Sequence, residues 1–174
     1  AIEGVLMQNC DFDVELIVAN DCSPDTTDYI INDIIQNYPE GKWITYYNHH
    51  ENLGMMANFN FAIQQAKGKY IALCDGDDYW TDPHKLQKQV DFLEANSTYI
   101  IHSGKAQIRE SNKLSGVIGN PLSKNTYLLA DFLTKNNLIT CTVMFRTTSV
   151  SGKYFKNLIF GDWMLYVLLL AQNQ

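Results

Sequence analysis

Apolar residues in the first half of the chain alternate between short continuous runs and helical spacing. Three runs have the length and composition of β-strands: residues 14–19, 43–47 and 70–74. Three segments repeat apolar side chains at the spacing of amphipathic helices: residues 25–38, 55–66 and 82–93. Asp25 and Asp82 are expected to cap the first and third of these helices, and Pro83 suits a first helical turn. The alternation of strand and helix predicts an α/β fold with a mostly parallel sheet flanked by helices.

The second half of the chain changes in character. Strands are expected at three places: residues 99–103, 106–108 and 139–146. Short helices are expected at two places: residues 128–133 and 163–170. Residues 111–125 and 147–157 are rich in polar and turn-forming residues, which is typical of loops. Residues 2–8, before the first strand, have the composition of a helix end.

Three acids follow the apolar run 70–74 within four positions: Asp75, Asp77 and Asp78. In open α/β sheets, ligands bind beyond the carboxyl ends of the strands. Carboxylates held together repel one another unless they share a cation, a proton or solvent, and their oxygens suit a hard divalent ion such as Mg²⁺ or Mn²⁺. A solvated acidic turn is the alternative. A calcium loop starting at Asp75 is excluded, because its twelfth position is Leu86 instead of glutamate.

Composition narrows the class of protein further. The chain has 174 residues, 46% of them hydrophobic, which is enough for a single domain with a substantial core. A net charge of −6 without a basic run argues against nucleic acid as a partner. The four cysteines form no CxxC pair, which argues against a zinc site or a disulfide framework and favours reduced thiols. We find neither a signal peptide nor a membrane-spanning apolar run, so a cytoplasmic location is expected.

Several short segments together carry a family resemblance. They occur in this order: Glu15–Thr27, Asn52–Gly54, Ala57–Asn58, Ala66–Trp80, Pro83, Lys85–Leu86 and Gln89–Val90. This ordered series resembles the family-two glycosyltransferases of bacterial type, which have the glycosyltransferase-A fold. Gly161-Asp162-Trp163 is a weaker match to the segment that carries the family's catalytic base. The resemblance implies one catalytic domain over residues 1–174, with a nucleotide-sugar-binding half at 1–98 and an acceptor-side half at 99–174.

The resemblance implies a nucleoside-diphosphate sugar donor, a Mn²⁺ or Mg²⁺ cofactor and inversion at the anomeric carbon. A cation on the departing diphosphate stabilises the charge that develops in the transition state. By analogy Asp77 is the metal ligand. Asp75 lies nearer the ribose or supports the metal, and Asp78 orients the loop.

Inversion in one displacement needs a base that accepts the proton of the acceptor hydroxyl. By family position this base is Asp162. The structural alternative for Asp162 is the N-cap of the helix that starts at Trp163. Trp163 itself either lines the acceptor site or packs in the core.

The nucleotide site is expected around the end of the first strand. Asp21 is placed to accept the imide hydrogen of uracil or thymine, which favours a UDP-sugar. The family usually has two acids here, whereas this chain has Asn20 before Asp21, and asparagine both donates and accepts hydrogen bonds. By analogy Asn52 and Gly54 pass beneath the donor and Asn58 faces the same region. The structural alternatives are a turn-forming acid, an ordinary Asn-Leu-Gly turn and a helix asparagine.

One family element has no counterpart in the sequence. The family's first strand, which also contacts the nucleotide, should precede Ile2, so we expect the natural protein to be longer at its amino end. Without that strand the neighbouring strands would expose apolar surface.

We therefore expect a metal-dependent inverting glycosyltransferase of surface polysaccharide synthesis, acting on a saccharide or lipid-linked acceptor. A lipid-linked acceptor would bring peripheral contact with the inner face of the membrane. Two alternatives stay open. A sugar-phosphate nucleotidyltransferase also uses a metal and a nucleotide, but needs a glycine-rich basic loop near its amino end. A non-catalytic module would bind a nucleotide sugar without turnover.

Overall fold

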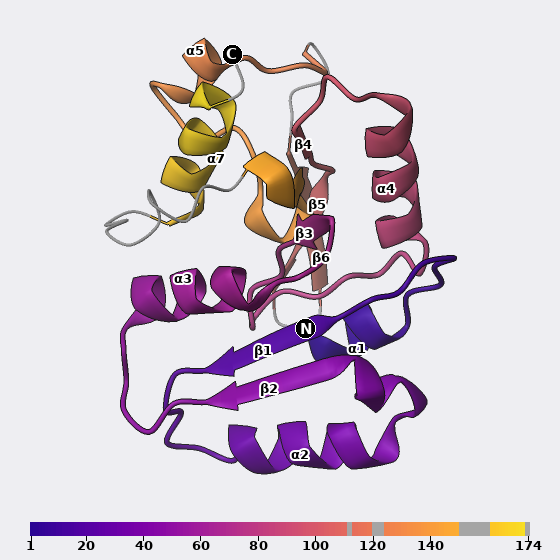
Figure 1. The fold of residues 1–174 in the computed structure, drawn as a ribbon, viewed down its shortest axis with the longest axis vertical. Coiled ribbons are helices and arrows are strands. Elements are labelled where there is room, and N and C mark those ends of the chain that lie inside the picture. Colours follow the sequence, from indigo (N-terminus) through magenta and orange to yellow (C-terminus); the bar gives the residue numbers. More distant parts are fainter. Residues whose placement is uncertain (111–112, 120–123, 150–160, 173–174) are drawn as a thin grey trace.

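The computed structural model describes residues 1–110, 113–119, 124–149 and 161–172 (Figure 1). Its α-helices are α1 (Ile2–Leu6), α2 (Thr27–Asn37), α3 (Met55–Gln65), α4 (Lys85–Ala95), α5 (Leu129–Phe132) and α7 (Asp162–Ala171). Its strands are β1 (Leu16–Asn20), β2 (Ile44–Asn48), β3 (Tyr70–Ala72), β4 (Ile101–His102), β5 (Ala106–Glu110), β6 (Lys113–Ile118) and β7 (Met144–Arg146). Short 3₁₀ helices are η1 (Pro39–Trp43), η2 (Thr140–Thr142) and η3 (Thr147–Ser149).

The strands form three groups. β1 and β2 are parallel, with Leu16 opposite Ile44, and α2 supplies the crossover that a parallel pair requires. β7 lies between β3 and β4 and is antiparallel to both, and β5 and β6 form an antiparallel hairpin. The expected α/β fold is confirmed. Among the described strands, the parallel pairing is that of β1 with β2.

The helices begin close to the expected positions, but both expected N-caps are wrong. The N-cap of α2 is Thr26 instead of Asp25. α2 starts at Thr27, and the Asp25 carboxylate accepts hydrogen bonds from the Thr27 N–H and Oγ1 at 3.0 and 2.6 Å. The N-cap expected at Asp82 is wrong, because α4 starts at Lys85 with His84 as its N-cap. Asp82 instead closes a turn before the helix, accepting the His84 N–H at 2.9 Å.

A side chain from α1's end completes the start of α4. Gln8 is 5% exposed, and its Oε1 accepts the Leu86 N–H at 3.0 Å. This bond satisfies one of the backbone donors that a helix leaves free at its first turn. Sequence reasoning missed it, because the donor and acceptor are far apart in the chain.

The second half differs more from expectation. The loop expected at 111–125 is wrong for Lys113–Ile118, which forms β6. All six residues of β6 are exposed, so the sequence there lacks the alternation that marks a half-buried strand. Only Met144–Arg146 of the strand expected at 139–146 forms a strand, because residues 140–142 turn as η2. Residues 111–112, 120–123 and 150–157 of the expected loops lie outside the described residues.

Two apolar clusters cover the opposite faces of β7. The larger contains Ile63, Ile71, Leu73, Phe132, Val143, Phe145, Leu165, Tyr166 and Leu169. The smaller contains Val5, Trp80, Leu86, Leu93 and Met144. Successive side chains of a strand point to opposite faces, so Phe145 joins the first cluster and Met144 the second. The strand thereby connects α3 and α7 on one side with α1 and α4 on the other.

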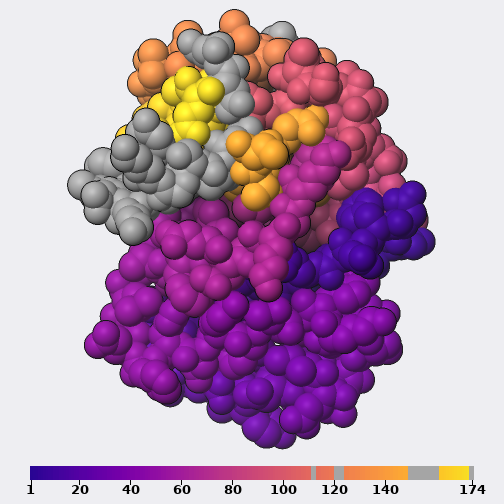
Figure 2. All heavy atoms as spheres, viewed as in Figure 1, coloured from indigo at the N-terminus to yellow at the C-terminus, as the bar shows by residue number. Residues whose placement is uncertain are grey.

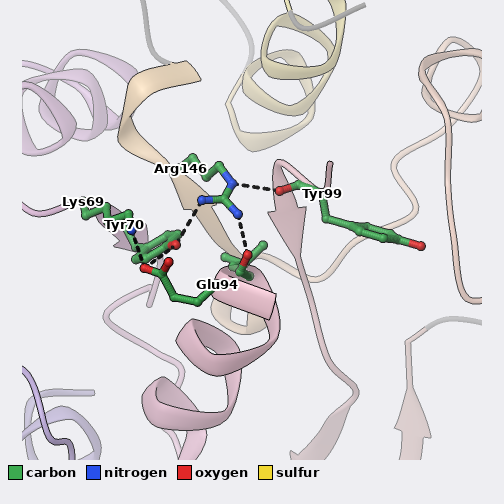
Figure 3. Close-up of polar contacts among 6 residues, drawn as sticks. Lys69, Tyr70, Glu94, Tyr99 and Arg146 are labelled. Atoms are coloured by element: carbon green, nitrogen blue, oxygen red, sulfur yellow. Dashed lines mark hydrogen bonds and ion pairs between the residues drawn. The ribbon is translucent and has the colours of Figure 1, made fainter. Parts of the chain in front are cut away.

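Arg146 joins three elements at the end of β3 that is remote from the acids (Figure 3). Its guanidinium donates to the carbonyl oxygens of Tyr99 and Leu93 at 2.9 and 2.5 Å and to Tyr70 Oη at 3.0 Å. Glu94 accepts from Tyr70 Oη at 3.0 Å and pairs with Lys69. A cation therefore satisfies carbonyls at the carboxyl end of α4.

A cleft of about 400 Å³ separates β1 from β3. Both strands and the helices α3 and α4 supply its walls, including Leu16, Ile17, Phe59, Ile63, Ala72 and Val90. Figure 2 shows the two parts of the molecule in space-filling form, the amino-terminal segments below in indigo and purple and the carboxyl-terminal ones above in orange and yellow. Among the described residues, no helix combines the length and apolar character needed to cross a bilayer.

Candidate active site

The three acids of the first half lie on a tight turn after β3. The Asp78 N–H donates to the Asp75 carbonyl at 3.1 Å, with Gly76 and Asp77 at the central positions. Asp75 and Asp77 are exposed. The turn is anchored beyond Asp78 by Trp80, which is buried and donates its indole N–H to the Cys141 carbonyl at 2.7 Å. Hydrogen bonding of β3 on one side and Trp80 on the other fixes the position of the acids.

Electrostatic coupling shows which acids are neighbours. The pKa of Asp75 is raised, first by partial burial of its carboxylate and then by the charges of Asp78, Asp77 and Asp162. Asp162 is remote in sequence, so only the fold brings it close to the turn. A bound cation would relieve this repulsion.

The chemistry of the acidic side chains indicates which metal ion could bind at the turn. In the described part of the chain, no group of three or more His, Cys, Asp or Glu side chains is arranged to hold a metal ion. Mg²⁺ is often bound through one or two carboxylates, with phosphate and water as the remaining ligands. Carboxylates of an exposed turn fit that mode, and Asp77 and Asp75 as the ligands stay a prediction.

Asp162 is the first residue of α7, directly after its N-cap Gly161. The alternative reading of Asp162 as the N-cap is therefore off by one residue, since the N-cap is Gly161. The Asp162 carboxylate accepts hydrogen bonds from the Trp163 N–H at 2.7 Å, Thr140 Oγ1 at 2.5 Å and Asn136 Nδ2 at 3.0 Å. Three donors thus hold the carboxylate in one orientation, as a general base requires. Nothing in the sequence pointed to Thr140 or Asn136, which both lie in the segment between α5 and β7.

Trp163 stands in the first turn of α7, and its contact with an acceptor stays a prediction. Its side chain is partly exposed, and its indole N–H donates to the Phe132 carbonyl at 2.7 Å. The ring therefore ties α7 to α5 while part of it stays open to solvent.

Asp21 joins the loops that follow β1 and β2. Its carboxylate accepts the N–H groups of Leu53 at 2.7 Å and Gly54 at 2.9 Å, and Asn52 Nδ2 donates to its carbonyl at 3.0 Å. A carboxylate has about four lone-pair sites, so Asp21 retains capacity to accept from a ligand. Gly54 has φ of +87°, a conformation that glycine adopts without the Cβ strain of other residues.

Asn20 and Asn58 hold the same region from inside. Asn20 is 5% exposed, donates to Tyr46 Oη at 3.0 Å and accepts the Ser23 N–H at 3.0 Å. Asn58 Nδ2 donates to the Ala19 carbonyl at 2.9 Å. Both amides shape the turn after β1, and a direct contact of Asn20 with the nucleotide stays a prediction.

The structure therefore gathers the predicted residues into two groups. Asn20, Asp21, Asn52, Gly54 and Asn58 surround the ends of β1 and β2. Asp75, Asp77, Asp78 and Asp162 surround the end of β3 and the start of α7. Nucleotide binding by the first group, and metal binding and base catalysis by the second, stay predictions.

Comparison with known proteins assigns this arrangement to a family. The sequence profile described as glycosyl transferase family 2 matches residues 1–153. The chain belongs to glycosyl transferase family 2. Its glycosyltransferase-A fold, expected from the resemblance, is confirmed by this membership.

Several relatives of this family 2 domain are bacterial. An uncharacterized protein of Mycobacterium tuberculosis (strain H37Rv) is 36% identical, with 96% of this chain and 48% of the relative aligned. Escherichia coli WfaP, named a UDP-Glc:alpha-D-GlcNAc-diphosphoundecaprenol beta-1,3-glucosyltransferase, is 28% identical over 99% of this chain and 64% of its own length. Bacillus subtilis TuaG, named as a glycosyltransferase of teichuronic acid biosynthesis, is 33% identical over 75% of this chain and 49% of its own length. The family 2 domain spans about half the length of most of these relatives.

Sequence reasoning about the domain missed a group of polar side chains behind the acidic turn. Lys85 Nζ donates to Gln89 Oε1 at 2.6 Å, and Gln89 Nε2 donates to the Thr142 carbonyl at 2.9 Å. His102 Nδ1 lies 3.0 Å from the same Gln89 nitrogen. Lys85 and Gln89 lie one turn apart in a helix, which was the only signal that could have linked them.

Proposed function

We propose that the protein is a metal-dependent, inverting glycosyltransferase that moves a sugar from a nucleoside diphosphate to a saccharide or lipid-linked acceptor. The observation that supports this best is that the fold brings Asp162 close enough to the acidic turn for its charge to act on Asp75. One displacement needs these groups together, with charge stabilisation on the leaving side and a base on the acceptor side.

Each acid has a distinct proposed role. Asp77, supported by Asp75, holds Mn²⁺ or Mg²⁺ against the diphosphate of the donor. The ion supplies Lewis-acid stabilisation of the departing diphosphate. Asp162 takes the proton of the acceptor hydroxyl, and Thr140 and Asn136 hold its carboxylate in place.

The nucleotide is proposed to lie over the ends of β1 and β2. Asp21 accepts the imide hydrogen of the base, while Asn20, Asn52 and Gly54 form the surrounding backbone and amide surface. The imide favours UDP, and the UDP-Glc in the name of the E. coli relative supports the same choice.

The acceptor is proposed to belong to surface polysaccharide synthesis. The names of the E. coli and B. subtilis relatives support this, since one acts on a diphosphoundecaprenol-linked sugar and the other belongs to teichuronic acid biosynthesis. We propose a cytoplasmic protein, with peripheral contact at the inner face of the membrane where the acceptor is lipid-linked.

The cleft between β1 and β3 is proposed to hold a further strand that is not among the described ones. Its walls are apolar side chains of two strands and of helices on both sides. A strand there would join the two sheet groups and cover surface that each leaves exposed.

The test is calorimetric titration of the full-length protein with UDP, GDP and TDP, with and without Mn²⁺. We expect Mn²⁺-dependent binding of UDP that Asp77→Ala abolishes. Asp162→Asn should keep UDP affinity but lower sugar transfer by about 100-fold, as the loss of a general base does. Asp91→Asn, an exposed acid on α4, serves as the charge-matched control and should change neither quantity.

The rival functions predict different results. Unchanged Mn²⁺-dependent affinity in Asp77→Ala would remove its metal role, and near-normal turnover in Asp162→Asn would remove the base. A non-catalytic module would bind UDP without sugar transfer. A sugar-phosphate nucleotidyltransferase would instead release pyrophosphate from a nucleoside triphosphate and a sugar phosphate.

A further inference from the structure

A second cavity, of about 690 Å³, lies between the acidic turn and the β5–β6 hairpin. One wall contains the acids Asp77 and Asp78 and the start of α4, and the opposite wall is the hairpin. Cys141 and Thr142 of η2 also line the cavity, and Thr140 of the same short helix donates to Asp162. The cavity therefore adjoins the proposed catalytic base.

Lys85 places a largely buried ammonium group in this cavity. Its Nζ lies 4.0 Å from the centre of the Trp80 ring and donates to Gln89 Oε1 at 2.6 Å. The described ion pairs of α4 join Lys88 to Asp82 and Glu94 to Lys69, and Lys85 takes part in neither. Burial lowers the pKa of Lys85 to about 8, so the group is still mostly protonated near neutral pH.

A buried ammonium without a carboxylate partner favours an anionic ligand. An ammonium has three donors, and Gln89 accepts one of them. Burial of a charge is costly unless it is paired, and a ligand anion would supply the missing partner. Asp82 does not compete for this role, because it already pairs with Lys88 at 2.7 Å.

The hairpin makes the wall opposite Lys85 largely apolar. Apolar side chains that line the cavity stand on β5 and β6 and are substantially exposed: Ile108, Leu114, Val117 and Ile118. Arg109, from the same hairpin, donates from Nη1 to Tyr79 Oη at 2.8 Å and so ties the hairpin to the loop after the acidic turn. A ligand that fills this cavity would meet cations and exposed apolar surface together.

We propose that this cavity binds the diphosphate of a lipid-linked acceptor, with Lys85 contacting the diphosphate and the side chains of Leu114 and Val117, which share one face of the β5–β6 hairpin, contacting the first part of the lipid. This assignment rests on the proposed function, because Asp162 must receive the proton of that acceptor. The sugar attached to the diphosphate would then extend past η2 toward Asp162. A purely saccharide acceptor would leave the ammonium without an anionic partner and the apolar wall uncovered.

The test uses farnesyl diphosphate as the probe, titrated into full-length protein saturated with UDP and Mn²⁺. We expect farnesyl diphosphate to bind. Farnesol and inorganic pyrophosphate should bind at least about tenfold more weakly, since each lacks one half of the contacts. Lys85→Met should lower the affinity for farnesyl diphosphate by about tenfold or more, as the loss of a charge-assisted hydrogen bond does. Lys69→Met, which removes an exposed ammonium paired with Glu94 outside this cavity, is the matched control and should bind as the wild type does.

A second variant separates the apolar contact from folding. Leu114 is 64% exposed, so the Leu114→Ser protein should fold normally. Its affinity for farnesyl diphosphate should fall about threefold, while its affinity for pyrophosphate should stay the same. The assignment is overturned if farnesyl diphosphate displaces UDP, if Lys85→Met binds it as the wild type does, or if pyrophosphate binds equally well. Absence of Mn²⁺-dependent UDP binding would instead overturn the proposed function, and it is measured separately in the same preparation.

Discussion

Replacing Gly4 with alanine should destabilise the protein and loosen the acidic turn. Gly4 lies in α1 against the backbone of Trp80, the residue that anchors the turn. A Cβ added at Gly4 would lie 2.8 Å from the Trp80 nitrogen and 2.9 Å from the Trp80 carbonyl oxygen. Both atoms belong to the backbone, so no side-chain rotation relieves the contact.

The magnitude follows from that contact. Ordinary separations of non-bonded carbon atoms start near 3.5 Å, so α1 or Trp80 must move by about 0.6 Å. Overpacking of this kind costs about 1–3 kcal/mol. Alanine recovers up to about 1 kcal/mol in helix propensity, but less in a helix of 5 residues. We expect a net loss of about 1–2 kcal/mol.

Urea unfolding followed by tryptophan fluorescence measures this loss, and UDP titration with Mn²⁺ measures the effect on the turn. The control is Gly116→Ala, because a Cβ at Gly116 in β6 meets nothing within 4 Å. Gly116→Ala should unfold at the same urea concentration as the wild type or slightly higher. A Gly4→Ala protein as stable as the wild type, with unchanged UDP affinity, would refute the reasoning.

Three further substitutions test single features of the structure. Gly54→Ala should cost about 1–3 kcal/mol through backbone strain alone, because φ is +87° and a Cβ meets nothing within 4 Å; urea unfolding that matches the wild type would contradict this. Arg146→Met should cost about 1–3 kcal/mol by leaving the Tyr99 carbonyl without its donor, while the Leu93 carbonyl keeps the Asn96 N–H; Lys69→Met, at an exposed ion pair, should change the melting curve little. Lys85→Met should raise the free energy of unfolding by on the order of 1 kcal/mol near neutral pH. Because the Lys85 pKa is about 8 when folded and near 10.5 when unfolded, the cost of its buried charge is complete below pH 8 and disappears as pH rises toward 10.5. The gain in Lys85→Met should therefore shrink over that range, and a gain independent of pH would contradict the account.

Local sequence patterns predicted most of the helices and strands in the first half of the chain. The apolar runs and helical spacing placed β1, β2, α2, α3, β3 and α4 to within a few residues, because each buries an apolar face and such faces have a fixed period. β6 was not predicted, because all of its residues are exposed. Its backbone hydrogen bonds to β5 produce no alternation of apolar and polar side chains. The caps of α4 were also misjudged, since Gln8 supplies a bond from the far end of the chain's first helix.

By itself the sequence determined the family, the order of the main elements and the acids Asp75, Asp77 and Asp78, because these are properties of contiguous segments. Only the tertiary structure decided that Asp162 approaches these acids, that Thr140 and Asn136 orient it, and that Lys85 faces a cavity beneath the hairpin. Each of these depends on contacts between residues far apart in the chain. Such contacts form when separate elements pack on a common core, and that packing is not encoded in any one local pattern.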